Sequence, residues 1–181
     1  MSRAPVIPRE AVRGAAADAA CAIAGLLGVA GTARAGDCHP IEADRVPPGL
    51  FEPGQRVTVV FADLRGGPGG PAGLMLTPEV LERVLDVLVG DATVKTLDER
   101  SCSALCELGN IAISAAASAL ARWLGETVWP SVPRIGFEKD PESPLAELCG
   151  ASPRSPGYVV EIELGRADGA LRIPFVWVPG P

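Results

Sequence analysis

The chain carries the same order of predicted elements twice, and this repetition constrains its fold more than any other feature. Each half of the 181 residues contains a long Ala-rich helix, which a Pro-bearing connection joins to a hairpin of two strands. When the second half is shifted back by 97 residues, Glu107 falls on Glu10 and Gly125 falls on Gly28. Two such units are expected to form one mixed sheet packed by long helices, a two-layer α+β fold with pseudo-two-fold symmetry.

Local patterns set the bounds of the expected elements. Helices are predicted where apolar residues recur at helical spacing before a terminal Gly, over 8–28, 78–89 and 98–124. Strands are predicted where β-branched residues gather, over 55–64, 73–76, 158–164 and 170–178. The Pro-rich stretches are expected to be irregular over 29–54 and 130–156, with one short helix at 144–148.

The division into domains follows from the repeat. We expect one domain over 1–181, with a first repeat over 1–90 and a second repeat over 98–181. The glycines of Gly66–Gly70 are expected to form a flexible turn between two strands. This turn resembles a phosphate-binding loop only superficially, because it lacks the following Lys-Ser or Lys-Thr and joins two strands.

Composition excludes several classes of function. The formal net charge is −6 and aromatic residues make up 4% of the chain, so binding to nucleic acid or to an anionic membrane is not expected. No clean apolar stretch reaches about 18 residues, so no helix should span a membrane. The apolar run 15–35 ends like a signal cleavage site, but Asp18 interrupts it and Glu10 lies where a basic leader belongs, which favours a folded helix.

The cysteines favour a reducing compartment. Their odd number and scattered spacing are not typical of a disulfide scaffold, and we expect reduced thiols in a cytoplasmic protein; they are Cys21, Cys38, Cys102, Cys106 and Cys149. The single histidine, His39, follows Cys38, and this is the only adjacent pair among the cysteines and the histidine. We therefore expect no metal site.

Polar residues form one stripe on the helix predicted over 98–124, at Ser103, Glu107, Asn110 and Ser114. Successive helical residues turn by about 100°, so these positions share one face. A polar face is ordinary on an amphipathic helix, but Asn is a weak helix former, and the small neighbours allow close approach by another backbone or a partner. A carboxylate and a carboxamide are therefore predicted to project together, while Ser114 and the flanking Trp123 and Trp129 are expected mainly to pack.

The segment SALCELGNI, from Ser103 to Ile111, resembles the signature of the CheC/CheX/FliY family of bacterial chemotaxis phosphatases. That signature is Asp or Ser, three residues, Glu, two residues, Asn, then about 22 residues and a Pro. Ser103, Glu107 and Asn110 fit it, and the 22 residues 111–132 precede Pro133. Because CheC-type proteins are themselves pseudo-symmetric repeats, the resemblance covers most of the chain and implies a CheC-like fold.

The resemblance implies an activity, namely hydrolysis of the aspartyl phosphate of a phosphorylated CheY-type response regulator. Asn110 would orient the attacking water, and Glu107 would pair with a cation of the regulator, such as the lysine near its phosphate. Ser103 and Pro133 would be supporting residues of the motif. The resemblance implies no cofactor of the chain's own, because the Mg²⁺ would belong to the regulator.

The first repeat departs from the signature. Glu10 matches, but Arg13 stands where Asn is expected, and Val6 stands where Asp or Ser is expected. Arginine cannot accept a hydrogen bond, so this copy is expected to be catalytically dead. Its loss leaves an alternative open, a non-catalytic module that binds a response regulator, a CheD-type deamidase or a flagellar switch component. In a third interpretation the chain is an unrelated α+β domain with a coincidental stripe, and a structure with Glu107 and Asn110 buried apart would favour it.

Overall fold

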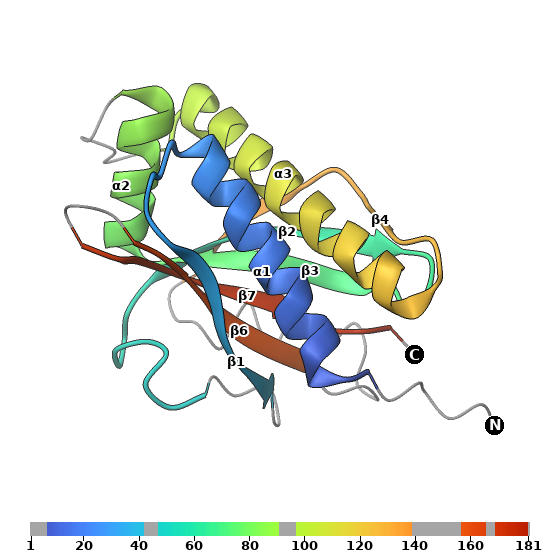
Figure 1. The fold of residues 1–181 in the computed structure, drawn as a ribbon. Coiled ribbons are helices and arrows are strands. Elements are labelled where there is room, and N and C mark those ends of the chain that lie inside the picture. The colour runs from blue at the N-terminus through green and yellow to red at the C-terminus, as the bar shows by residue number, and fades with distance from the viewer. Residues whose placement is uncertain (1–6, 42–46, 91–96, 139–156, 166–168, 181) are drawn as a thin grey trace.

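Each half of the chain builds one long helix and a set of strands (Figure 1). The computed structural model describes residues 7–41, 47–90, 97–138, 157–165 and 169–180. The first half contains α1 (Arg9–Leu26), β1 (Ala33–Ile41), β2 (Val57–Arg65) and β3 (Gly70–Leu76), and α2 (Pro78–Val89) follows it. The second half contains α3 (Glu99–Leu124), β4 (Trp129–Pro130), β5 (Arg134–Glu138), β6 (Gly157–Leu164) and β7 (Leu171–Trp177).

The strands form one seven-stranded sheet in the order β1-β6-β7-β3-β2-β4, and β5 also pairs with β2. The central neighbours β3 and β7 come from different halves, and each half places its first strand beside the hairpin of the other half. All described strand pairs are antiparallel, whereas a mixed sheet was expected. The reason is that two halves related by a two-fold axis through the sheet bring equivalent strands together in opposite directions.

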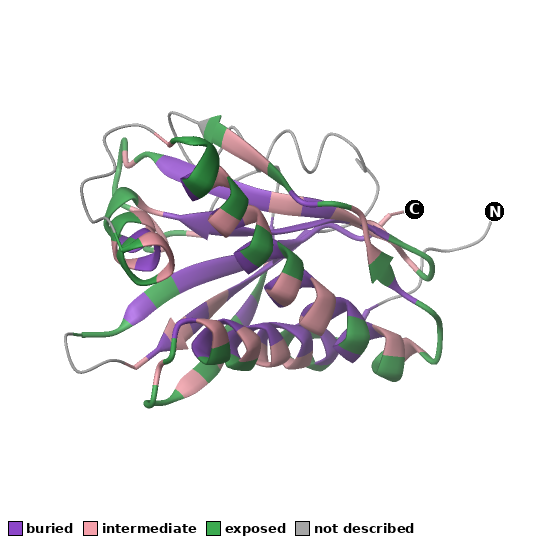
Figure 2. Ribbon diagram, turned by 90° about the horizontal axis from the view of Figure 1, so that it is seen from above, coloured by how far each residue is buried: buried purple, intermediate pink, exposed green. Residues whose placement is uncertain are grey.

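The helices lie on one face of the sheet, so the expected two-layer α+β arrangement is confirmed (Figures 1 and 2). Their bounds follow the local signals. The Oγ1 of Thr77 accepts a hydrogen bond from the Val80 N–H at 3.4 Å, and the Oδ1 of Asp98 accepts one from the Ser101 N–H at 2.8 Å. Gly90 and Gly125 end α2 and α3 in the left-handed conformation, as is common for a glycine at this position.

The core lies mainly between the helices and the sheet. Small side chains let α1 and α3 pack closely against each other, and the fully buried alanines include Ala15, Ala16, Ala19, Ala112 and Ala116. α3 is long and apolar enough to cross a membrane by length and composition alone, but half of that apolar window is buried inside the fold. Its apolar composition is therefore accounted for by its place in the core.

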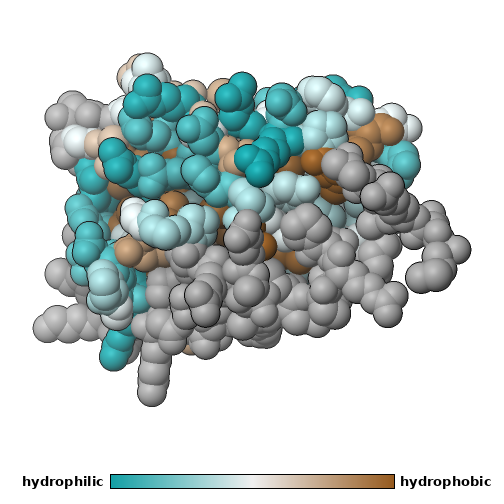
Figure 3. All heavy atoms as spheres, turned by 90° about the horizontal axis from the view of Figure 1, so that it is seen from below, coloured by the Kyte–Doolittle hydropathy of each residue, from teal (hydrophilic) through white to brown (hydrophobic). Residues whose placement is uncertain are grey.

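A second, smaller apolar cluster lies on the opposite face of the sheet. It includes Val59, Met75, Val159 and Val176, and the side chains of the segment 50–51 pack against it. Seen from this side, the described surface is mostly hydrophilic, with apolar residues showing between the polar ones (Figure 3).

Two strands lie where the sequence indicated irregular structure. β1 falls within 29–54, and β5 falls within 130–156. Both lie at the margins of the sheet, where a proline such as Pro40 and a local irregularity are tolerated, and β1 shifts register between Ala35 and Cys38. The expectation of irregular structure was wrong there because the strands are stabilised by partners from the other half. The helix expected at 144–148 lies outside the described residues.

The turn Gly66–Gly70 is tightly packed, so the expectation of a flexible turn was wrong. A Cβ on Gly66 would lie within 3.0 Å of the Thr127 carbonyl oxygen, and a Cβ on Gly70 would lie as close to the Val178 carbonyl oxygen. The indole N–H of Trp177 donates a hydrogen bond to the Gly69 carbonyl at 2.9 Å. The glycines are required by positive φ angles and close backbone approach rather than by mobility.

Candidate functional site

The polar stripe predicted on α3 faces outward. Ser103, Glu107 and Asn110 are exposed, and Ser114 is partly buried. The opposite side of the helix is buried, with Leu105, Leu108, Ala112, Ile113 and Leu120 in the core. The helix is therefore held by its apolar side while the carboxylate and the carboxamide remain accessible.

Gly109 brings α3 unusually close to β2. A Cβ on this residue would lie within 3.0 Å of Cγ1 of Val60 and 3.5 Å from Cβ of Pro133. Pro133 is buried, and the Cys106 thiol points to its carbonyl with an Sγ–O distance of 3.8 Å. The role that the structure indicates for Pro133 is thus to pack beneath α3, directly beside the residues of the motif.

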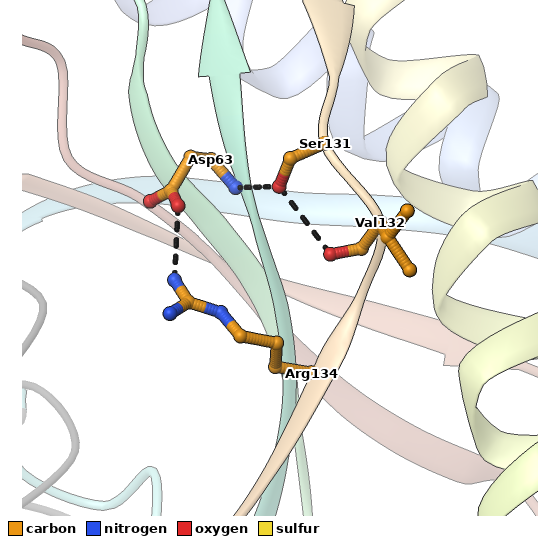
Figure 4. Close-up of polar contacts among 4 residues, drawn as sticks. All are labelled: Asp63, Ser131, Val132 and Arg134. Atoms are coloured by element: carbon orange, nitrogen blue, oxygen red, sulfur yellow. Dashed lines mark hydrogen bonds and ion pairs between the residues drawn. The ribbon is translucent and has the colours of Figure 1, made fainter.

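The segment between β4 and β5 forms a bulge, which we define as residues 131–133. Two residues of β2, Ala62 and Asp63, lie opposite these three residues in the sheet register. The Ser131 N–H donates to the Asp63 carbonyl at 2.8 Å, and the Asp63 N–H donates to Oγ of Ser131 at 3.0 Å. Figure 4 shows the side-chain part of this contact, with the Arg134 guanidinium 2.9 Å from the Asp63 carboxylate.

A groove of about 1100 Å³ lies between the first half of α3 and the segment 130–133. All four residues of the family motif line this groove, namely Ser103, Glu107, Asn110 and Pro133. Within the described part of the chain, the side chains of Glu107 and Asn110 make no hydrogen bond or ion pair. Glu107 and Asn110 are not buried apart, so the observation that would have favoured an unrelated domain is not made.

The charged side chains that line the groove are mainly acidic. Asp98, Glu99 and Glu107 carry carboxylates, and Arg100 supplies a single cation among the lining residues. An excess of negative charge attracts a partner that presents cations, such as lysine, near its own binding site. The groove therefore suits a basic or partly basic protein surface.

The cysteines of α3 do not provide a nucleophile. Burial raises the pKa of the Cys106 thiol, and the neighbouring Cys102 raises it further. A raised pKa keeps the thiol protonated at neutral pH, whereas a nucleophilic cysteine must ionise. Among the residues that the structure describes, no group of three or more His, Cys, Asp or Glu could hold a metal ion. The groove therefore offers a carboxylate and a carboxamide to a bound partner.

The first repeat presents a different surface. Glu10 and Arg13 are both exposed on α1, where an amide is replaced by a guanidinium. Val12 occupies the position 97 residues before Gly109, and its side chain is fully buried. Val6 lies outside the described residues. The amide that could position water is therefore present only in the second copy of the motif.

Several residues of the groove carry no signal in the sequence. Val132 is 82% exposed and lines the groove, although nothing in its neighbourhood marks it as part of a site. Ser131 and Asp63 lie far apart in the sequence, and they come together only because β4 and β5 pair with β2. Trp123 and Trp129, expected to pack in the core or at its edge, are 55% and 49% exposed and therefore lie at the edge.

Comparison with known proteins identifies the segment that carries this site. Residues 101–136 match the model of the CheC-like family, and they run from the first turn of α3 into β5. The matched segment includes all four residues of the motif and the bulge 131–133. No curated protein sequence matches the chain.

Solved structures share the fold along nearly the whole chain. FliY from Thermotoga maritima is 22% identical with a TM-score of 0.71, covering 94% of this chain and 87% of that chain. A chain of the CheX-CheY-BeF3-Mg²⁺ complex from Borrelia burgdorferi is 15% identical with a TM-score of 0.62, covering 95% and 99%. The FliM middle domain from Vibrio alginolyticus is 12% identical with a TM-score of 0.59, covering 94% of each chain. Residues 101–136 are therefore similar to the CheC-like family, and the chain as a whole shares the fold of FliY and of a chain of the CheX-CheY complex.

Proposed function

We propose that this protein hydrolyses the aspartyl phosphate of a phosphorylated CheY-type response regulator. The observation that carries the proposal is that Glu107 and Asn110 are exposed in one groove, with side chains free to meet a partner. Asn110 follows Glu107 by three positions in α3, so the two residues are about 4.5 Å apart along the helix axis. Both groups can therefore enter the same small site on a receiver domain.

Hydrolysis of the aspartyl phosphate requires this chain mainly to position the reacting groups. An acyl phosphate already has a good leaving group, the aspartate carboxylate, so hydrolysis is accelerated mainly by orienting a water molecule in line with the phosphorus–oxygen bond. The Asn110 amide can accept a hydrogen bond from that water and donate another to the phosphoryl group. The water oxygen bonds to phosphorus, the bond to the aspartate breaks, and inorganic phosphate leaves.

Glu107 would hold the partner in place. Its carboxylate would pair with a cation of the regulator, which orients the receiver so that its phosphoryl group faces Asn110. The Mg²⁺ that neutralises the phosphoryl oxygens would be bound by the regulator, and this chain would need no cofactor. We place this reaction in the cytoplasm, where response regulators act.

A second function is favoured by one comparison. The FliM middle domain, a domain of similar fold, indicates that this architecture also occurs outside the CheX and FliY proteins. The chain could therefore bind a response regulator or a flagellar switch component without hydrolysing phosphate. Binding to a CheD-type deamidase stays a prediction of the family resemblance.

The decay of a phosphorylated receiver separates these functions. CheY-type receivers of the source organism would be phosphorylated with a small-molecule donor, and the loss of phosphate would be followed with wild type, Glu107→Ala and Asn110→Ala. Removing the amide should slow the added hydrolysis by about 100-fold or more, as loss of a positioned polar group does in other enzymes. Ser118→Ala is the matched control, because Ser118 is exposed on the same helix and, among the residues that the structure describes, its hydroxyl bonds only the Ser114 carbonyl. Equal decay in all variants, at the rate of the receiver alone, would leave only the binding function.

A further inference from the structure

Val132 has an exposed position that the fold does not require. It is 82% exposed, the highest value among the large apolar side chains that the structure describes. Single exposed apolar residues are common on protein surfaces, so exposure alone indicates no role. Val132, however, lines the groove that contains Glu107 and Asn110.

The backbone on both sides of Val132 is held firmly. On one side, Ser131 makes two hydrogen bonds with Asp63, of 2.8 Å and 3.0 Å. On the other side, Pro133 is buried beneath α3 against Gly109. The Oγ of Ser131 also donates to the Val132 carbonyl at 3.3 Å. These contacts fix the direction of an otherwise uncovered side chain.

A second layer of contacts fixes the strand that follows. The Arg134 guanidinium forms an ion pair with Asp63 at 2.9 Å, and its Cζ lies 4.8 Å from the centre of the Phe61 ring. The Val132 side chain points away from Asp63, so it takes no part in this network (Figure 4). A bulge commonly re-aims one side chain of a strand, and the side chain re-aimed here is Val132.

The surroundings of Val132 indicate the kind of partner. Across the groove, the carboxylates of Glu99 and Glu107 outnumber Arg100, the one cation among the lining residues, so the opposing surface should carry positive charge. A partner that also offers an apolar depression would meet the groove at two points, one apolar and one charged. A β-branched apolar side chain on a fixed backbone loses little conformational freedom on binding, so little of its contact energy is lost to ordering.

We propose that Val132 is an apolar anchor that inserts into a depression on the receiver domain, beside its phosphorylated aspartate. This role rests on the proposed function, because it concerns how the same partner is held in the same groove. Val132 would add binding energy at one point of the groove, while Glu107 and Asn110 would contact the receiver at another. The bulge 131–133 and the buried Pro133 serve to present this side chain.

The test separates binding from hydrolysis. The dissociation constant would be measured for CheY-type receivers of the source organism activated with BeF3⁻ and Mg²⁺, and kcat and KM would be measured with the phosphorylated receivers. Val132→Ala should weaken binding about tenfold and raise KM by a similar factor with kcat unchanged, because the contact exists before and during the reaction. Val132→Ile should bind like the wild type.

Two controls test whether weaker binding of Val132→Ala has another cause, either a general loss of structure or the loss of any exposed apolar side chain. Val87→Ala removes another exposed valine, on α2 and outside the groove, and should change neither constant. The melting temperature of Val132→Ala should equal that of the wild type, because the side chain is mostly exposed.

Each outcome bears on one of the two proposals. If Val132→Ala binds as tightly as the wild type while Asn110→Ala stops hydrolysis, the anchor is refuted and the phosphatase function stands. If Val132→Ala weakens binding but the wild type hydrolyses nothing, the anchor stands and the phosphatase function is refuted. If no activated receiver binds the wild type, both are refuted.

Discussion

Replacing Gly109 by alanine tests whether the close approach of α3 to β2 positions the site. Glycine in the interior of a helix costs about 1 kcal/mol relative to alanine, so helix propensity alone predicts that Gly109→Ala stabilises the protein. The packing predicts the opposite, because the new Cβ would lie within 3.0 Å of Cγ1 of Val60. Val60 is fully buried in the sheet, and because protein interiors are close-packed, a shift of its side chain would disturb neighbouring core residues.

The expected magnitude follows from these two opposing effects. Inserting a methyl group into a packed core typically costs about 1–3 kcal/mol, and the gain in helix propensity offsets about 1 kcal/mol of this. We therefore expect Gly109→Ala to lower the free energy of unfolding by about 1 kcal/mol. Val60→Ala alone should cost about 2–3 kcal/mol, because it removes two buried methyl groups and leaves a cavity.

A double-mutant cycle isolates the contact itself. In Val60→Ala/Gly109→Ala the methyl group of residue 109 can occupy the space left by Cγ1 of Val60. The double variant should therefore be more stable than the sum of the single changes predicts, by about 1–2 kcal/mol. Urea unfolding followed by circular dichroism measures each free energy, and a loss of 1 kcal/mol should lower the melting temperature by about 2–4 °C.

A matched control separates propensity from packing. Gly25 lies in α1, and a Cβ there would meet nothing within 4 Å. Gly25→Ala should therefore be neutral or stabilising, by up to about 1 kcal/mol. If Gly109→Ala is as stabilising as Gly25→Ala, or if the cycle is additive within about 0.5 kcal/mol, close packing between α3 and β2 does not hold the site.

Two further predictions concern the turn at 66–70 and the first repeat. Gly66 and Gly90 share a φ of 76°, but only Gly66 has a backbone neighbour, the Thr127 carbonyl, within 3.0 Å of an added Cβ. Gly66→Ala should therefore destabilise the protein by at least about 1 kcal/mol more than Gly90→Ala in urea unfolding, and equal losses would show that only the φ angle matters. Burial raises the pKa of the Cys38 thiol from 9.0 to about 11, against a smaller opposing effect of Arg9. The folded state then holds this proton more tightly than the unfolded state, so its contribution to stability is full below pH 9 and is lost as the pH rises to about 11. Cys38→Ala should flatten the fall in unfolding free energy between pH 9 and pH 11, and an unchanged slope would assign that fall to other groups, such as Tyr158, whose pKa burial also raises.

The parts of the fold that could be predicted are those with local signals. The helices carry capping residues, helical periodicity and terminal glycines, and all three lie within about two residues of their expected bounds. The hairpin strands are rich in β-branched residues. β1 and β5 have no comparable signal, because Gly36, Pro40 and Gly136 lower their β propensity. These strands are stabilised by pairing with strands of the opposite half. Such pairing cannot be predicted from a short segment of the sequence.

The site, like the fold, could be predicted only where its signals are local in the sequence. Glu107 and Asn110 could be predicted to share a face because helical spacing is a local property. The second wall of the groove depends on contacts such as that between Ser131 and Asp63, which are 68 residues apart. The bulge that exposes Val132 arises only when β4 and β5 pair with β2, since its extra residue is defined relative to that strand. The sequence therefore predicted the wall of the groove that α3 forms, but it did not predict the wall formed by residues 130–133.

The first half of the chain offers an internal comparison for the site. At the positions 97 residues earlier, Arg13 replaces Asn110, Val12 replaces Gly109, and Ala35 and Gly36 replace the Val-Pro pair of the bulge. Nevertheless, β1 pairs with β6 much as β5 pairs with β2, and β1 has its own register shift. The fold therefore persists without the amide, the helical glycine or the exposed valine. Asn110, Val132 and Pro133 line one groove, and Gly109 lies beside Pro133. Because the architecture does not require these residues in the first half, their presence together in the second half supports the proposal that they serve a function at the groove.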